Sequence, residues 1–546
     1  MRYSFRRLIA GFSLPIAFLL GAPSPVALAQ HEEHEGHEAH EHLGTVHFDT
    51  SCNKSAQQHF DSGMKYQHSF WYRESKKMFE EALKADPECG IAYWGIAQSL
   101  LANPFNPTPP KNLVEGLAAT QKGKQIGAKT LRERDLIAAI GVFYTDFDTV
   151  DQRTRAQSYL KAMEQVASRY PNDDEVQIYY ALALDIAASP ADKTYANQLK
   201  AASILEAIFK RQPYHPGVTH YLIHTYDYPP LAQKGLDAAK RYASIAEAAP
   251  HAQHMPSHIF TRVGDWEASI ASNQKAADLA RQDKEADDQL HASDYLVYAY
   301  LQLGRDRDAR RIIDEMVTVT GYNADRNTAA FALAASPARY AVERNDWAAA
   351  AKLSLRPTKF GYADAMTHFA RALGNVRTGN PGAATADLMR LVEIRDRLRE
   401  AKDAYWSEQV DIQRQIVAAW NSLAEQRYEE ALRGMSAAAD AEDRTEKAPV
   451  TPGPLAPARE LYGFMLLERG MGAEALAAFE TSMTHDPNRF NGLAGAARAA
   501  ERAGNVAKAK TYYTRLVALA QGGDGSRPEL ATARQFLANG PRASER

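Results

Sequence analysis

The chain has 546 residues, of which 45% are hydrophobic and 24% are charged, and its formal net charge at pH 7 is −3. This composition is that of a globular protein, and the length suits several domains or one long repeat array. The near-neutral charge argues against a nucleic-acid partner.

The N-terminal segment, residues 1–29, has the pattern of a secretory signal peptide. A basic stretch over residues 1–7 precedes an apolar run over residues 8–22, and small residues at 27 and 29 form a cleavage site before Gln30. The apolar run is short for a membrane span, and no other run is apolar enough to cross a bilayer. The sequence therefore predicts an exported protein, periplasmic or secreted, whose mature chain has no membrane span.

A segment rich in histidine and glutamate follows, over residues 30–50. It has no apolar face, so we expect it to be a disordered tail. One interpretation is a solvated polar tail, and the other is a loose metal-collecting tract, because neutral imidazole binds copper, zinc and nickel. The candidate ligands of that tract are His31, His34, His37, His40 and His42.

The chain has two cysteines, Cys52 and Cys89. In an oxidising compartment such a pair predicts a disulfide, which would connect the segment before the first repeat to that repeat. A metal-binding or catalytic role for the two thiols is the less favoured alternative.

A helical pattern repeats from residue 51 to residue 445. In the unit that begins at Ala56, small residues or proline stand at four fixed positions, which are Gly63, Ser75, Ala82 and Pro87. Small residues let two helices approach closely, and a proline ends a helix because it lacks the N–H that would continue the hydrogen bonding. The same frame returns at Ala456 and, one repeat length later, at Phe490.

These residues resemble the tetratricopeptide repeat, a helix–turn–helix unit of about 34 residues. The resemblance covers most of residues 55–520 and implies an all-α fold, a right-handed solenoid of helical hairpins. It also implies a concave groove that binds a protein or a peptide. We expect a proline-rich linker over residues 446–455, a C-terminal repeat pair with a capping helix over residues 456–538, and a tail over residues 539–546.

Histidines recur at one repeat length within the central repeats, residues 213–304. His220 and His224 are each followed, one repeat length later, by another histidine, His254 and His258. Residues four apart share one face of a helix, and a histidine pair at that spacing suits metal chelation. Pro256 should kink the second of these helices or shift its start.

Further candidates occupy the same face in the repeat frame, and the resemblance implies that this face lines the groove. They are His251, His291, Asp294 and Asp227. We predict a metal site built from these residues and the two histidine pairs. The candidates exceed the four ligands of a structural zinc site, so either two metals bind or some of these residues orient the others, as Asp294 could.

Copper and zinc are the metals that this ligand set favours, because it offers imidazole and carboxylate but no thiolate. Two other interpretations stay open: the histidines could clamp a peptide or an anion without metal, or serve only the structure. The preferred function is an exported scaffold whose groove holds a transition metal. The alternatives are a metal-dependent hydrolase or oxidoreductase that uses the same cluster, and a metal-free scaffold that binds peptides.

Overall fold

The computed structural model describes residues 42–539, and every regular element among them is a helix. Helices adjacent in the sequence pack against each other as hairpins, for example α2 (Lys54–His68) on α3 (Tyr72–Ala85), and each hairpin packs on the next. The predicted all-α fold of helical hairpins is therefore confirmed. No helix in this part of the chain has both the length and the hydrophobicity that a bilayer crossing requires.

The remaining helices follow in chain order. Those before the histidine-rich repeats are α4 (Ile91–Leu100), α5 (Pro110–Ile126), α6 (Leu131–Tyr144), α7 (Gln152–Arg169), α8 (Asp174–Ala187) and α9 (Ala196–Phe209). The central helices are α10 (Pro216–Tyr226), η1 (Ala232–Gly235), α11 (Leu236–Ile245), α12 (Pro250–His254), α13 (Pro256–Val263), α14 (Trp266–Gln282), α15 (Ala286–Gln302) and α16 (Asp306–Met316). The helices after them are α17 (Asn327–Glu343), α18 (Trp347–Ala351), α19 (Gly361–Arg377), η2 (Pro381–Ala384), α20 (Thr385–Glu400), α21 (Ala404–Ala424), α22 (Tyr428–Asp443), α23 (Ala458–Glu468), α24 (Gly472–His485), α25 (Phe490–Arg502), α26 (Val506–Leu519) and α27 (Pro528–Asn539).

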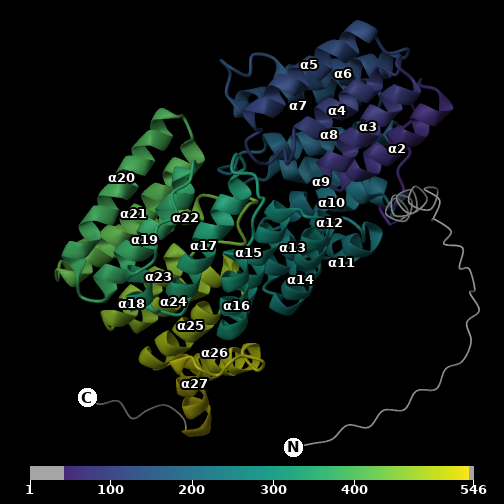
Figure 1. The fold of residues 1–546 in the computed structure, drawn as a ribbon. Coiled ribbons are helices and arrows are strands. Elements are labelled where there is room, and N and C mark those ends of the chain that lie inside the picture. Colours follow the sequence, from purple (N-terminus) through teal and green to yellow (C-terminus); the bar gives the residue numbers. More distant parts are fainter. Residues whose placement is uncertain (1–41, 540–546) are drawn as a thin grey trace, which may run out of the picture. The chain divides into compact units, whose positions relative to one another are not determined.

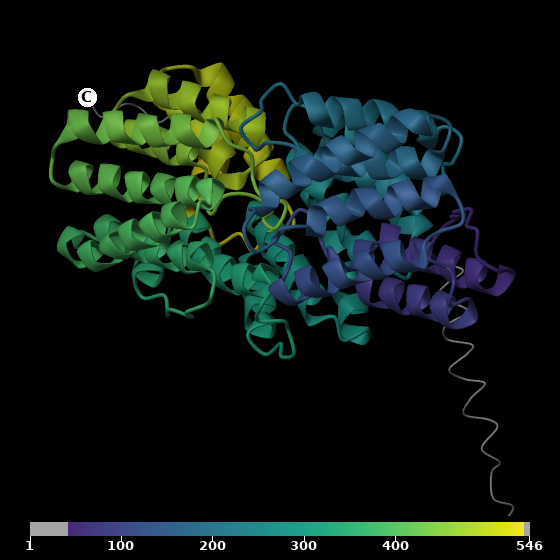
Figure 2. The same ribbon diagram turned by 90° about the horizontal axis from the view of Figure 1, so that it is seen from above.

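The central helices lie between the two ends of the solenoid (Figures 1 and 2). Helix α10 packs on α2 and α8 from the N-terminal end, while α15 packs on α17 and α25 from the C-terminal end. Side chains on the central helices are therefore enclosed from both directions, which explains the burial of the histidines they carry.

Local signals in the sequence set several helix ends. The side chain of Asn53 caps α2, and Thr130 and Glu133 form a reciprocal capping box at the start of α6. Pro216 and Pro250 stand in the first turns of α10 and α12. An N–H at these positions would have no acceptor within the helix, so a proline there costs no hydrogen bond.

Glycine lets the helices of a hairpin approach closely. A Cβ at Gly63 would lie 2.8 Å from the ring of Phe79, and a Cβ at Gly463 would lie 2.8 Å from the ring of Phe479. The same contact of a phenylalanine ring with a glycine therefore packs the two helices of the first repeat and of a C-terminal repeat. Their common spacing in the sequence suggests this.

The expected break at Pro256 is present. Helix α12 ends at His254, Met255 keeps helical dihedral angles, and α13 begins at Pro256. His254 and His258 thus stand on two short successive helices, yet they remain neighbours.

The segment before the first repeat differs from the prediction. Residues 43–50 are not a disordered tail, because Leu43, Val46 and Phe48 are buried in the core. Composition dominated by histidine and glutamate concealed these three apolar side chains. The signal peptide and the tail histidines from His31 to His40 lie outside the described residues, and His42 is exposed, 3.9 Å from a carboxylate oxygen of Glu247.

Two other predictions concern connections between segments. Cys52 and Cys89 form a disulfide, as expected. The proline-rich residues 446–455 connect α22 to α23 without a helix, but Val450 and Thr451 in this segment are buried. This connection, called the α22–α23 loop below, packs against the central helices instead of acting as a spacer.

Candidate metal centre

Six histidines on the central helices gather into two groups of three. The first trio is His220 and His224 of α10 with His251 of α12, and the second trio is His254 of α12, His258 of α13 and His291 of α15. Within each trio, one ring nitrogen from every residue lies within 4.8 Å of the others. The two histidine pairs that the sequence places one repeat length apart are both included.

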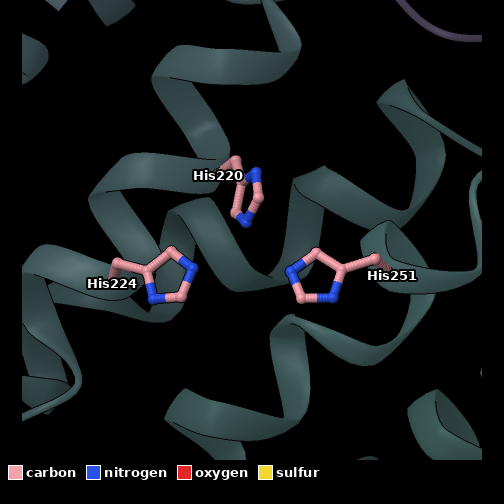
Figure 3. A group of neighbouring side chains, drawn as sticks. All are labelled: His220, His224 and His251. Atoms are coloured by element: carbon pink, nitrogen blue, oxygen red, sulfur yellow. The ribbon is translucent and has the colours of Figure 1, made fainter. Parts of the chain in front are cut away.

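Unpartnered nitrogen atoms define the first trio. The Nδ1–H of His220 donates a hydrogen bond to the carbonyl oxygen of His68 over 2.7 Å, so its Nε2 carries a lone pair. Nε2 of His220, His224 and His251 is buried and has no hydrogen-bond partner among residues 42–539. The three rings point toward a common space (Figure 3). The arrangement offers three nitrogen ligands and no protein group that satisfies them.

The second trio brings two lone pairs together. Nδ1 of His254 lies 2.6 Å from Oδ1 of Asn273, and Nδ1 of His258 lies 2.8 Å from a carboxylate oxygen of Asp227. Both contacts assign the proton to Nδ1, which leaves a lone pair on each Nε2. These two Nε2 atoms are only 3.0 Å apart. Two acceptors at that distance repel each other unless a cation lies between them.

Burial keeps the six imidazoles neutral. It lowers the pKa of His220 and of His291 to about 3, and it lowers the pKa of the other four histidines as well. For five of the six, the positive charge of a protonated neighbouring histidine would lower the pKa further. At His258 the charges of Lys447 and Arg262 lower the pKa, whereas Asp227 raises it. Neutral imidazole is the form that binds a metal ion, so the site needs no deprotonation to be competent at neutral pH.

Asp227 holds the second trio in place instead of joining it as a ligand. Its carboxylate accepts from His258, from Nε of Arg262 over 2.8 Å and from Nζ of Lys447 over 2.7 Å. The positive charges of Lys447 and Arg262 hold the pKa of Asp227 well below its ordinary value, although burial acts in the opposite direction. Such a carboxylate fixes the tautomer and the orientation of a ligating imidazole.

The α22–α23 loop covers the second trio. Lys447 of this loop pairs with Asp227, and the carbonyl oxygen of Thr451 accepts a hydrogen bond from the hydroxyl of Tyr295 over 3.1 Å. The ring of Tyr295 packs edge-on against that of His254, with centroids 4.7 Å apart. Sequence reasoning missed Lys447 because it lies far along the chain from the histidines.

Asp294 is not part of either trio. The hydroxyl of Ser336 donates to its Oδ1 over 3.0 Å, and Arg339 lies 3.5 Å from its Oδ2. Asp294, which the sequence predicts as a ligand or as a residue that orients one, thus lies outside both trios. Its side chain faces α17, which supplies both of these partners.

A third group of metal-ligand type is a closed hydrogen-bond network. The carboxylate of Glu175 contacts Nε2 of His68 at 3.1 Å and Nε2 of His215 at 2.8 Å. The remaining ring nitrogens are also engaged, because Nδ1 of His68 bonds to Tyr221 and Nδ1 of His215 accepts from the N–H of Val218. This network holds the His68 carbonyl that orients His220. Spacing in the sequence gave no sign of it.

A cavity reaches both trios. Four of its lining histidines come from them, two from the first trio and two from the second, namely His224, His251, His258 and His291. Phe70, Asp288 and Arg326 line the same cavity. Burial raises the pKa of Asp288 to about 6 against the opposing effect of Arg326. Ions held by the trios would thus be open to a small molecule in this space.

A second cavity is lined by the α22–α23 loop, by residues of α19, α21 and α22, and by Arg262 of α13. Its lining includes the stacked rings of Tyr362 and Trp406, whose centroids are 4.1 Å apart, and the carboxylate of Glu442. Burial raises the pKa of Glu442 to about 8, and its Oε2 accepts from the N–H of Ala458 over 2.6 Å.

No model of a known protein family and no curated protein sequence matches this chain. Several solved structures are similar to this chain at low identity. Human IFIT1, solved as a dimer with m7Gppp-AAAA, is 12% identical over 89% of this chain and 99% of its own, with a TM-score of 0.33. Yeast Tom70 is 11% identical over 89% and 96%, with a TM-score of 0.32, and the TPR domain of P58(IPK) is 13% identical over 89% and 99%, with a TM-score of 0.18.

The chain folds as an all-α solenoid of helical hairpins. Its own helices and their packing establish this fold.

Proposed function

We propose that this protein is an exported helical-repeat scaffold that holds transition-metal ions, copper or zinc, on its two histidine trios. The observation that carries the proposal is the convergence of three buried Nε2 atoms, those of His220, His224 and His251, without any hydrogen-bond partner among the described residues. A bound ion would satisfy all three at once.

The cost of leaving these atoms unpaired argues against a purely structural role. A buried polar atom without a partner destabilises a fold by about 1–3 kcal/mol. The network of His68, Glu175 and His215 shows how the same chain satisfies buried histidines that serve structure alone, since every ring nitrogen there has a partner. The first trio lacks such partners, which fits ligands that await an ion.

The donor set favours copper or zinc. Each trio offers neutral imidazole nitrogen and neither a thiolate nor a carboxylate. Imidazole suits zinc, copper, nickel and iron, whereas magnesium, calcium and manganese prefer oxygen ligands. A three-histidine site with an open fourth position is the arrangement of catalytic zinc, so a closed structural site is the poorer fit.

The scaffold part of the proposal rests on the fold, because helical-repeat solenoids present extended surfaces that bind proteins or peptides. Export rests on the signal-peptide pattern of residues 1–29. The disulfide between Cys52 and Cys89 suits an oxidising compartment. The metal would then stabilise the central helices and shape the surface that a partner protein meets.

Elemental analysis of the exported protein, purified without a histidine tag, tests the proposal. We expect one or two copper or zinc ions per chain, most of them lost in the variant His220→Ala/His224→Ala. Deletion of residues 30–41 should leave the metal in place, and the deletion must stop there because residues 43–50 pack into the core.

His368→Ala is the matched control. His368 is buried outside both trios, and its Nδ1 lies 2.7 Å from a carboxylate oxygen of Asp387. Equal metal content in the wild type and in His220→Ala/His224→Ala would end the proposal. Loss of metal on deletion of residues 30–41 alone would move the site to the tail.

A metal-dependent enzyme is the second candidate, and the cavity favours it. The four histidines that line this space leave room for water on an ion, and Asp288 stands beside them as a candidate proton acceptor. Zinc-dependent hydrolysis of a simple ester, lost in His291→Ala and kept in His368→Ala, would support this role. Absence of hydrolysis in the zinc-loaded protein would refute the enzyme function and leave the scaffold function as the remaining one.

A further inference from the structure

The two trios are immediate neighbours. The ring centroids of His224 and His258 are 5.9 Å apart, and those of His251 and His254 are 6.0 Å apart, although each of these pairs joins different trios. Within the trios, ring centroids are 4.4 to 6.4 Å apart. The shortest distances between the trios thus fall within the range of those inside them, and ions held by the two would be neighbours.

Both trios face the same cavity. His224 and His251 of the first trio and His258 and His291 of the second line one continuous space. A small molecule that enters it reaches both ions at once, which is the geometry of a two-metal site.

The charge of the ligand set restricts which metal ions can occupy both trios. All six ligands are neutral imidazoles, and the nearby carboxylate of Asp227 is already engaged by Arg262 and Lys447. The carboxyl group of Asp288 lines the same cavity together with Arg326, whose positive charge offsets it. Two adjacent divalent ions without an anionic ligand would repel each other strongly. Two-metal centres of iron or manganese in helical proteins contain several carboxylates instead. A pair of monovalent ions, or a pair bridged by an anion from the cavity, meets the charge requirement.

We propose, on the basis of the metal-binding function above, that the two trios form one dinuclear copper centre that binds dioxygen between its ions. Copper supplies the monovalent state in the reduced protein and tolerates an all-imidazole ligand set. When dioxygen enters, each copper(I) ion gives up one electron and the dioxygen molecule takes both. Two copper(II) ions and one bridging peroxide result, and the peroxide supplies the missing negative charge. No proton and no further reductant is consumed.

Two phenylalanine rings pack on histidines of the first trio, and one of them, Phe70, also lines the cavity. The ring of Phe70 stacks on that of His251, with centroids 5.3 Å and planes 19° apart, and the ring of Phe105 stacks on that of His224 at 4.3 Å. These contacts fix the imidazole planes and place apolar surface beside the proposed ions.

The test uses the full exported chain, loaded with copper(I) without air and then exposed to dioxygen. We expect two copper ions per chain by elemental analysis and uptake of one dioxygen molecule per copper pair. The oxidised protein should give almost no electron paramagnetic resonance signal, because the unpaired electrons of neighbouring copper(II) ions couple through a shared bridge. A signal that accounts for all the copper, or no dioxygen uptake, would overturn the inference.

His291→Ala breaks the pair while leaving the first trio complete. The ring of His291 packs against His254, His258 and Tyr295, so its removal leaves the contacts of the first trio intact. One copper per chain with a visible resonance signal and no dioxygen uptake is expected. His224→Leu removes a ligand of the first trio instead and should also leave one copper per chain, a visible resonance signal and no dioxygen uptake. His368→Ala should behave as the wild type. Dioxygen uptake that persists in both trio variants would overturn the pair.

The outcomes separate the two proposals. A chain that binds neither copper nor zinc refutes the metal-binding function itself. A chain that binds two copper ions as independent, magnetically visible centres keeps that function and refutes only the dinuclear site.

Discussion

His224→Leu should stabilise the metal-free protein while it weakens metal binding. Nε2 of His224 is buried without a hydrogen-bond partner among the described residues, which costs about 1–3 kcal/mol. Leucine has a similar volume and no polar atom, so this cost disappears. The substitution also loses the stacking of His224 on Phe105, worth about 0.5–1.5 kcal/mol. The net expectation is a gain in the free energy of unfolding of about 1 kcal/mol.

Differential scanning calorimetry in the presence of a chelator measures the effect. For a chain of this length, a gain of that size corresponds to a rise in Tm of about 1–2 °C. The order should reverse when copper or zinc is added, because an ion at a hundredfold excess over Kd stabilises the wild type by about 2.7 kcal/mol. His224→Leu binds the ion weakly and gains less. The two proteins thus exchange rank with metal.

His368→Leu is the control with the opposite sign. His368 donates to Asp387, so its removal leaves a buried carboxylate with one partner fewer and should lower stability with or without metal by about 1–3 kcal/mol. If His224→Leu also proves less stable than the wild type in chelator, the nitrogen of His224 is satisfied in the metal-free protein and the reasoning is wrong.

Three further predictions concern the surroundings of the site. Asp227→Asn should weaken binding of the second metal ion about 10–100-fold, as measured by calorimetric titration. It should also lower the free energy of unfolding by about 3 kcal/mol, because Lys447 loses its buried partner. Unchanged metal affinity would exclude an orienting role for Asp227. The pKa of Glu442 is raised from 4.5 to about 8, so the folded state retains a proton that the unfolded state releases, and stability falls as pH rises between these values. Glu442→Gln should remove this loss of stability, which is on the order of 2 kcal/mol for a partly exposed group. Thermal unfolding of both proteins from pH 5 to 9 measures it. If stability depends on pH in the same way in the wild type and the variant, Glu442 is ionised in the folded state. Replacing Cys52 and Cys89 by serine opens a link across 37 residues and should cost about 3–4 kcal/mol, detected as a lower Tm that reductant does not change further.

The histidines that share a helix face, or stand at equivalent positions of neighbouring repeats, could be predicted from the sequence. The recurrence of His220 and His224 as His254 and His258 followed from repeat periodicity, because equivalent positions of stacked hairpins face the same side. His251 and His291 followed from the same frame. Asp294 satisfied that frame equally well but pairs with Arg339 of α17. A position on a helix face does not determine which neighbouring helix its side chain contacts.

By itself, the sequence determined most helices, their hairpin pairing and a set of candidate ligands that contains the six histidines together with Asp294 and Asp227. These depend on periodicity, capping residues and fixed spacing over short range. Tertiary structure alone decided how the six histidines divide into two trios, and that Lys447 and Glu175 act on them from distant parts of the chain. It also decided that Leu43 and Phe48 belong to the core. These contacts join segments remote in sequence, and only the folded chain brings them together.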